Sequence, residues 1–146
     1  LEGVPSKLLI LGKLGRQQKK LLKKHQIEYE NFYNIRYEEV IALYGRCDIL
    51  LFVSTYEGFG LPILEAQTTG RPVICSNAAS LPEVAGGAAE IADPYSVEAI
   101  RRAIFNLTEN PERRRQLIAN GRENAERFRP EEIAKKYAAL YEQIAR

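Results

Sequence analysis

Two glutamates and two glycines stand close together between Ser54 and Glu65, with a spacing that could serve a phosphate-containing ligand. Gly58 and Gly60 allow positive φ and a close approach of main-chain N–H groups to a ligand. A helix is expected from Leu61, and the first N–H groups of a helix, at the positive end of its dipole, favour an anion. These amides could hold a diphosphate without a metal ion.

The two carboxylates of this segment flank the expected anion site. Glu57 lies in the loop and Glu65 lies about one turn into the helix, so both could accept hydrogen bonds from ligand hydroxyl groups. Spacing alone leaves other interpretations open. Glu57 could be a solvated loop charge, and Glu65 could only complement the helix N-terminus, which contributes ~0.3–1 kcal/mol. The two glycines could serve the turn alone.

Short apolar runs alternate with segments of helical periodicity along the chain. The expected strands are Lys7–Leu11, Glu30–Ile35, Asp48–Val53, Pro72–Cys75 and Ala88–Ala92. This alternation predicts an α/β fold, a doubly wound parallel sheet of about five strands with helices on both faces. The aliphatic run Asp48–Val53 is typical of a strand buried on both faces. Ligands of such sheets bind beyond the carboxyl ends of the strands, where the segment after Val53 lies.

The helices of the prediction begin and end at recognisable residues. Ser96 and Asn110 are expected N-caps, and Gly70 is expected to end the helix that starts at Leu61. The expected helices are 16–26, 37–46, Leu61–Thr69, Leu81–Ala85, one after Ser96, one from Asn110 to about Phe128, and one from Pro130 with Ile133, Tyr137, Leu140 and Ile144 on one stripe.

Composition limits the class of protein. The 146 residues are 45% hydrophobic and 27% charged, which is typical of one globular domain, residues 1–146. A net charge of +2 does not favour a nucleic-acid partner. The longest apolar run, Ile49–Val53, is too short to span a bilayer, and no secretory pattern is recognised, so a cytoplasmic location is expected. Because methionine is absent, the chain is expected to be a segment of a longer protein.

Other chemistry-bearing residues form weaker patterns. Cys47 and Cys75 lie beside apolar runs and are expected to be buried, reduced thiols. With His25 as the one histidine, neither a zinc-ligand spacing nor a serine–histidine pair is present. The lysine pairs at 19–20 and 23–24 are candidates for peripheral contact with an anionic membrane face, and a solvated face is the alternative.

The segment YEGFGLPILEAQTTGRPVICS closely resembles the signature of retaining glycosyltransferases of the GT-B fold, family 4, the glycosyl transferases group 1. Glu57 and Glu65, with seven residues between them, match the two glutamates of that family. The segments Glu39–Tyr44, Leu81–Val84 and Asp93–Pro94 are also similar to the family pattern, and the resemblance extends from about Lys7 to the end of the chain.

The resemblance implies that the chain is the Rossmann-like, C-terminal donor-binding domain of such an enzyme, incomplete at its N-terminus and without the acceptor domain. By the family pattern, Glu57 is the catalytic residue that contacts donor-sugar hydroxyls near the reacting carbon, and Glu65 binds the ribose hydroxyls. Main-chain N–H groups hold the sugar and diphosphate, a glycine loop approaches the phosphates, and a backbone contact meets the base. The residues implied for the sugar and diphosphate are Gly58, Phe59, Gly60 and Leu61. Gly12 is implied for the glycine loop and Ile35 for the contact with the base.

The implied reaction is retaining transfer of a hexosyl group, of mannosyl or glucosyl type, from GDP-hexose or UDP-hexose to an acceptor hydroxyl in polysaccharide biosynthesis. No metal or other cofactor is implied. An arginine and a lysine that hold the diphosphate in the family are expected in the segment before Leu1, so the chain is expected to be inactive without its N-terminal acceptor domain.

Three other functions compete with this one. A catalytically silent nucleotide-binding or scaffolding module could share the fold, and a sugar-nucleotide epimerase could share the GT-B architecture, although the spacing of the glutamates favours the transferase. A signalling receiver domain needs an aspartate at the end of its central strand, where this chain has Ser54-Thr55.

Overall fold

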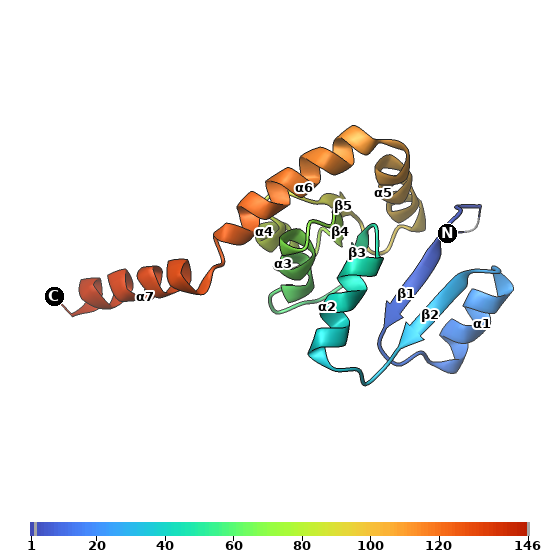
Figure 1. The fold of residues 1–146 in the computed structure, drawn as a ribbon, viewed down its shortest axis with the longest axis horizontal. Helices are drawn as coiled ribbons and strands as arrows, with labels where there is room; N and C mark the ends of the chain where they lie inside the picture. Colours follow the sequence, from blue (N-terminus) through green and yellow to red (C-terminus); the bar gives the residue numbers. More distant parts are fainter. Residues whose placement is uncertain (2, 146) are drawn as a thin grey trace. The chain divides into compact units, whose positions relative to one another are not determined.

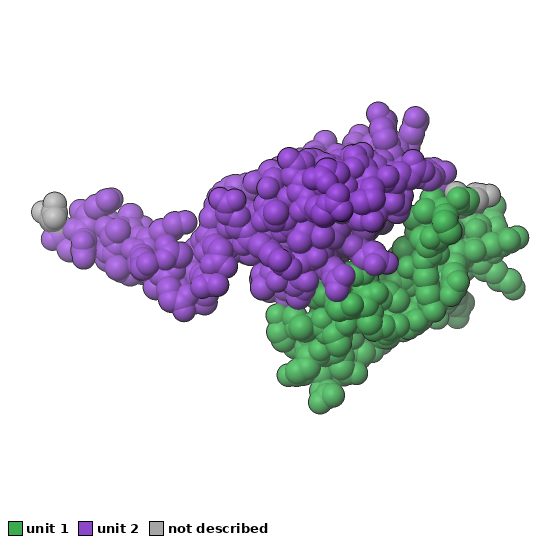
Figure 2. Space-filling model, turned by 45° about the horizontal axis from the view of Figure 1, so that its top comes forward, with its two compact units in different colours: residues 1–47 green, residues 48–146 purple. Residues whose placement is uncertain are grey.

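The computed structural model describes residue 1 and residues 3–145 and consists of two compact units, residues 1–47 and 48–146 (Figure 2). In the described residues, five strands pair in parallel, two in the first unit and three in the second, and helices connect them (Figure 1). The predicted α/β class with parallel strands is confirmed, and the strands form two separately hydrogen-bonded sheets. The description of residues 1–146 as a single domain stays a prediction.

The first unit is a strand–helix–strand–helix segment. Its elements are β1 (Lys7–Leu11), α1 (Arg16–Lys24), β2 (Glu28–Phe32) and α2 (Tyr37–Arg46). The second strand was expected over Glu30–Ile35, and this is wrong at both ends, because β2 pairs with β1 from Lys7↔Glu28 to Leu11↔Phe32. Asn34 then adopts a positive φ of 56°, which ends the extended backbone and leaves Ile35 in a loop.

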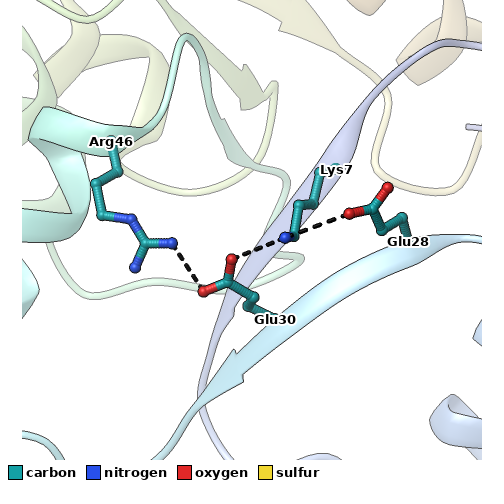
Figure 3. A network of polar contacts seen from close by, with 4 residues as sticks. All are labelled: Lys7, Glu28, Glu30 and Arg46. Carbon is teal, nitrogen blue, oxygen red and sulfur yellow. Dashed lines mark hydrogen bonds and ion pairs between the residues drawn. The ribbon is translucent and has the colours of Figure 1, made fainter.

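A chain of ion pairs joins β1, β2 and α2 on the surface of the first unit (Figure 3). Lys7 Nζ lies 2.9 Å from Glu30 Oε1 and 3.3 Å from Glu28 Oε1, and Arg46 Nη2 lies 2.7 Å from Glu30 Oε2. Hydrogen bonds from Arg46 and then Lys7 lower the pKa of Glu30, and hydrogen bonds to Glu30 and then Glu28 raise the pKa of Lys7. Since these side chains are exposed, solvent screens their attraction and each pair stabilises the unit little.

The second unit contains a three-stranded sheet of order β3-β4-β5. Its strands are β3 (Leu50–Phe52), β4 (Val73–Ser76) and β5 (Glu90–Ala92). The prediction that the run Asp48–Val53 is buried on both faces is wrong, since β3 is short and Leu51 is 37% exposed. The physical reason is that β3 lies at the edge of this sheet, whereas β4 is central and all its residues are buried.

Five helices accompany this sheet, and α6 packs against α3 and α5 (Figure 1). They are α3 (Leu61–Thr68), α4 (Leu81–Ala85), α5 (Val97–Glu109), α6 (Pro111–Glu126) and α7 (Pro130–Ile144). Both predicted N-caps are confirmed: Ser96 Oγ accepts a hydrogen bond from Ala99 N at 3.1 Å, and Asn110 Oδ1 accepts one from Arg113 N at 3.0 Å. Gly70, with φ of 72°, follows α3 as expected.

A buried polar network fastens α3, α4 and α6 together. Gln67 Nε2 donates to the carbonyl of Ala85 at 3.1 Å, and Asn124 Nδ2 donates to Gln67 Oε1 and to the carbonyl of Val84, both at 2.8 Å. Gly121 permits the approach of α6, because an added Cβ there would lie 2.9 Å from Gln67 Cγ. Buried amides that are fully hydrogen-bonded fix the relative position of the elements they join.

The two cysteines differ in environment. Cys75 in β4 is completely buried, as predicted, and burial raises the pKa of its thiol to about 12. Cys47 is only half-buried, so the prediction of burial is wrong for it, since it follows α2 at the end of the first unit rather than lying within a strand. Both are thiols.

The last helix carries the apolar stripe of the prediction, but the stripe is largely exposed. Tyr137, Leu140 and Ile144 are all exposed and Ile133 is half-buried. Across the residues the structure describes, no helix is long and apolar enough to cross a bilayer.

Candidate functional site

The segment that joins β3 to α3 lies at the carboxyl end of the sheet, as the fold predicts, and two serine hydroxyls hold it there. Ser76, the last residue of β4, donates its Oγ hydrogen to the carbonyl of Ser54 at 2.5 Å. Ser80 Oγ lies within hydrogen-bonding distance of two carbonyls, that of Phe59 at 2.7 Å and that of Glu57 at 3.2 Å. The backbone of the loop is therefore fixed at its start and at its end.

The two glycines of the loop have different structural roles. Gly60 is buried with φ of 110°, and a Cβ at this position would lie 2.7 Å from Leu81 Cδ2. Gly58 has no positive φ, and a Cβ there would meet nothing within 4 Å. The expectation that both glycines supply positive φ is right for Gly60 and wrong for Gly58, because the chain turns sharply only where it enters the helix.

The entry into α3 presents a short row of main-chain donors. The carbonyl of Gly60 accepts the first hydrogen bond of the helix from Ile63 N at 3.0 Å, and Pro62 has no N–H. In the described part of the chain, the N–H groups of Phe59, Gly60 and Leu61 meet no acceptor. Unpaired amides at the positive end of a helix dipole form an arrangement that stabilises a bound anion.

Glu65 lies on the more accessible face of the same helix. Four residues after Leu61, it shares the face of that residue, whereas Ile63, Leu64, Ala66 and Gln67 are buried. The Cα–Cβ bonds of a helix tilt toward its N-terminus, so the Cβ of the half-buried Glu65 leans toward the end of α3 that carries the donors. Its own carbonyl accepts a hydrogen bond from Thr69 Oγ1 at 2.9 Å, so its main chain is part of the regular helix end.

Glu57 precedes the row of amides and is half-buried. The carbonyl of Glu57 lies 3.2 Å from Ser80 Oγ, so the main chain of Glu57 is positioned by that hydroxyl while its carboxylate belongs to the side chain and can change conformation. Glu57 therefore precedes, and Glu65 follows, the three main-chain amides of Phe59, Gly60 and Leu61 in the sequence. This arrangement can hold a phosphate group on amides and offers carboxylate acceptors to hydroxyl groups next to it.

An aromatic contact supports the loop from the far end of the chain. The rings of Phe59 and Phe128 meet edge to face, with centroids 5.8 Å apart and an interplanar angle of 79°. Phe128 lies between α6 and α7, and the Arg127 guanidinium lies 5.3 Å from the centre of its ring. The main chain at Phe59 is thus braced from a segment remote in sequence.

Two of the predicted site residues belong to the first unit and are described within it. Gly12 has a φ of 125° at the end of β1, and its N–H donates to the carbonyl of Phe32 at 2.8 Å. Because that N–H is used, an anion at this turn would be met by the amides that follow it. Ile35 is half-buried in the loop after β2. The other six, Glu57, Gly58, Phe59, Gly60, Leu61 and Glu65, are brought together in the second unit.

The supporting residues Ser76, Ser80 and Phe128 were missed from the sequence. Ser76 ends β4 and Ser80 follows it, and the carboxyl ends of parallel strands share one edge of a sheet, a signal that could have placed both serines beside the loop. No local pattern could have paired Phe128 with Phe59. Within the described residues, no group of three or more His, Cys, Asp or Glu side chains is arranged to hold a metal ion.

Comparison with known proteins gives consistent matches. Residues 2–124 match the family model described as "Glycosyl transferases group 1". The O-antigen chain mannosyltransferase B of Escherichia coli is 44% identical over 91 residues, which are 62% of this chain and 24% of that protein. The MMP alpha-(1->4)-mannosyltransferase of Mycolicibacterium hassiacum is 38% identical over 114 residues, which are 75% of this chain and 28% of that protein.

A solved structure supports the same conclusion about the fold. Sucrose-phosphate synthase from Thermosynechococcus elongatus matches 93% of this chain and 38% of its own with a TM-score of 0.79 and 26% identity. The chain spans about a quarter of the length of each of the two mannosyltransferases named above.

Proposed function

This chain belongs to the glycosyl transferases group 1 family, and we propose that it binds the nucleotide-sugar donor for retaining transfer of a hexosyl group to an acceptor hydroxyl. The observation that carries this proposal is the row of unpaired amides at Phe59–Leu61, on a loop held by Ser80. The names of the two mannosyltransferase relatives support a mannosyl group, and the O-antigen relative supports a role in polysaccharide biosynthesis. The donor is a GDP-hexose or a UDP-hexose.

The amides and the dipole of α3 act on the diphosphate. During transfer, a bond forms between the acceptor oxygen and the anomeric carbon while the bond from that carbon to the diphosphate oxygen breaks, and the proton of the acceptor hydroxyl passes to the departing diphosphate. The nucleoside diphosphate leaves with the electron pair, so negative charge grows on its phosphate. N–H groups that are already oriented toward this charge stabilise the transition state more than the ground state.

The two carboxylates orient the donor on either side of the diphosphate. Glu65, on the accessible face of α3, accepts hydrogen bonds from the ribose hydroxyls. Glu57 accepts hydrogen bonds from hydroxyls of the donor sugar near the reacting carbon, and its rigid backbone keeps it in position. Neither is assigned as a nucleophile, because retention in the family is ascribed to attack on the face from which the diphosphate departs.

The remaining contacts belong to other parts of the protein. We assign the turn after Gly12 to the phosphates and the backbone at Ile35 to the base. We assign the acceptor to an N-terminal domain of the same enzyme. We place the reaction in the cytoplasm. The 146-residue chain alone therefore binds the donor without transferring its sugar.

Titration calorimetry with matched ligands tests the role of Glu65. We expect the unaltered chain to bind UDP or GDP at least about tenfold more tightly than the 2′,3′-dideoxy form, since a hydrogen bond to a charged group contributes ~1.5–3 kcal/mol. Glu65→Gln should reduce this preference to a few-fold. Glu98→Gln, which removes an exposed glutamate from the first turn of α5, is the matched control and should keep it.

A second pair of ligands tests Glu57. The affinity gained when the hexose is attached to the nucleoside diphosphate should be lost in Glu57→Gln and kept in Glu98→Gln. No binding of any nucleotide at millimolar concentration would remove the proposed function. Binding to which the sugar contributes nothing would identify the chain as a silent nucleotide-binding module instead.

A further inference from the structure

The helix α1 of the first unit has a strongly one-sided charge. Five of its nine residues are basic, none is acidic, and the basic residues are Arg16, Lys19, Lys20, Lys23 and Lys24. Their spacing of three and four residues places all five on one side of the helix, which we call the basic face. All five side chains are exposed.

This concentration of charge is unfavourable for the helix itself. Three pairs, 16–20, 19–23 and 20–24, put like charges four residues apart, which destabilises a helix. No ion pair from the basic face to another described residue is formed. The chain has a net charge of +2, of which α1 contributes +5, so the rest of the chain sums to −3. The excess of positive over negative charge is thus concentrated on α1, although most of the basic residues lie elsewhere in the chain.

Two other helices pair an exposed cation with a glutamate of the same helix. Arg115 pairs with Glu112 at 2.5 Å in α6, and Lys135 pairs with Glu132 at 2.6 Å in α7, each across one helical turn. The sequence of α1 contains no aspartate or glutamate that could form such a pair. The contrast indicates that the counter-charge of the basic face comes from outside the chain.

We propose that the basic face docks on the surface of a bilayer that contains anionic phospholipid. A helix surface is convex and presents its cations as a broad patch, which matches a planar array of lipid phosphates. Leu21 lies three residues before Lys24, beside the basic face, and is 55% exposed. With about 3.6 residues per turn, Leu21 points away from Lys19 and Lys23, so the docking rests on the cations and is electrostatic.

The composition of α1 disfavours a nucleic acid as the partner. Four of the five cations are lysines, which are compact charges without the bidentate geometry that reads bases or clamps single phosphates. The helix has no aromatic side chain on which a base could stack. The basic face lies on α1 of the first unit, whereas the amides at Phe59–Leu61 and the two glutamates lie in the second unit.

Sedimentation with sucrose-loaded vesicles tests the proposal on the purified chain. We expect binding to phosphatidylcholine vesicles that contain 30% phosphatidylglycerol, weakening as salt rises, and no binding to pure phosphatidylcholine. Lys23→Gln with Lys24→Gln should weaken binding about 25-fold, taking about fivefold for each lysine. The double variant Lys135→Gln with Lys136→Gln removes the same charge from another exposed helix and should stay within twofold.

Three results would overturn the proposal. The first is retention on anionic vesicles that both double variants reduce equally, since the effect would then follow net charge alone. The second is absence of vesicle binding at 50 mM salt, which would make the basic face a solvated surface. The third is tight binding of a 20-nucleotide RNA by a chain that does not bind vesicles. If Lys23→Gln with Lys24→Gln weakened that binding, the partner of the basic face would be a nucleic acid. Circular dichroism of each variant checks that α1 is folded.

Discussion

Gly60 and Gly58 are two residues apart, yet only one of them requires glycine. Gly60 combines a φ of 110° with a side-chain neighbour 2.7 Å from where its Cβ would lie, whereas Gly58 has neither constraint. The sequence could identify a glycine-rich turn but could not distinguish the two positions, because φ is set by how the loop meets α3. The role of Ser80 could not be predicted from the sequence either. Its hydroxyl is bonded to the carbonyl of Phe59 and does not cap α4.

Alanine substitutions at the two glycines test this difference. Gly60→Ala should lower the free energy of unfolding by about 1–2 kcal/mol or more, because a residue with a Cβ is strained at positive φ and Leu81 must move. Gly58→Ala should stay within about 0.5 kcal/mol of the unaltered chain. Urea unfolding measures both. Equal losses in the two variants would contradict the roles assigned here.

Cys75 gives a prediction about pH. Burial raises the pKa of its thiol from the ordinary 9.0 to about 12, so the unfolded chain releases this proton at lower pH than the folded chain does. The stability that Cys75 contributes is complete below pH 9 and is lost as pH rises toward 12. The free energy of unfolding of the unaltered chain should therefore fall faster than that of Cys75→Ala, by up to about 1.4 kcal/mol per pH unit.

The half-buried Cys47 serves as the control for this experiment. Cys47→Ala should keep the alkaline slope of the unaltered chain. Parallel slopes in the unaltered chain and in Cys75→Ala would show that the thiol of Cys75 ionises in the folded state near its ordinary pKa, against its complete burial.

At the scale of elements, the predictions that depended on local residues were right. Ser96 and Asn110 cap α5 and α6 because an N-cap needs only a side-chain oxygen three residues before its donor. Strand positions were less accurate. The range of β2 and the burial of β3 depend on which strands pair and in what register, and these partners are distant in sequence.

The hydrogen bond that joins α3 to α6 was not predictable either, because its two residues are distant in sequence. Gln67 and Asn124 look like ordinary polar helix residues in the sequence, but they are buried and bonded to each other at 2.8 Å. Since α3 carries the row of amides at its N-terminus, this joint also fixes where those donors lie.

Asn124→Ala tests the strength of the joint. Removing the amide leaves Gln67 Oε1 and the carbonyl of Val84 without their donor inside the protein, which should cost about 1–3 kcal/mol in the free energy of unfolding. Asn120→Ala changes an exposed asparagine on the same helix and should cost less than about 0.5 kcal/mol. A loss for Asn124→Ala no larger than that for Asn120→Ala would mean that the network does not hold α6 on α3.

At the scale of the whole molecule, the chain consists of two compact units and spans about a quarter of the length of the two mannosyltransferase relatives named above. The predicted fold class and family follow from one contiguous signature and its surrounding elements, which is why the sequence could supply them. The identity of a donor does not follow from that signature. Direct measurement of binding must therefore identify the ligand.

The central claim is that the amides at the start of α3 bind the diphosphate of a nucleotide sugar. The direct measurement is an amide ¹H–¹⁵N NMR titration of the chain with GDP and UDP, read residue by residue in the second unit. We predict that the largest shifts in that unit occur at Phe59, Gly60 and Leu61 and that they are absent with the nucleoside alone. Saturating nucleotide that leaves these three amides unmoved, or shifts centred on another part of the unit, would contradict the claim.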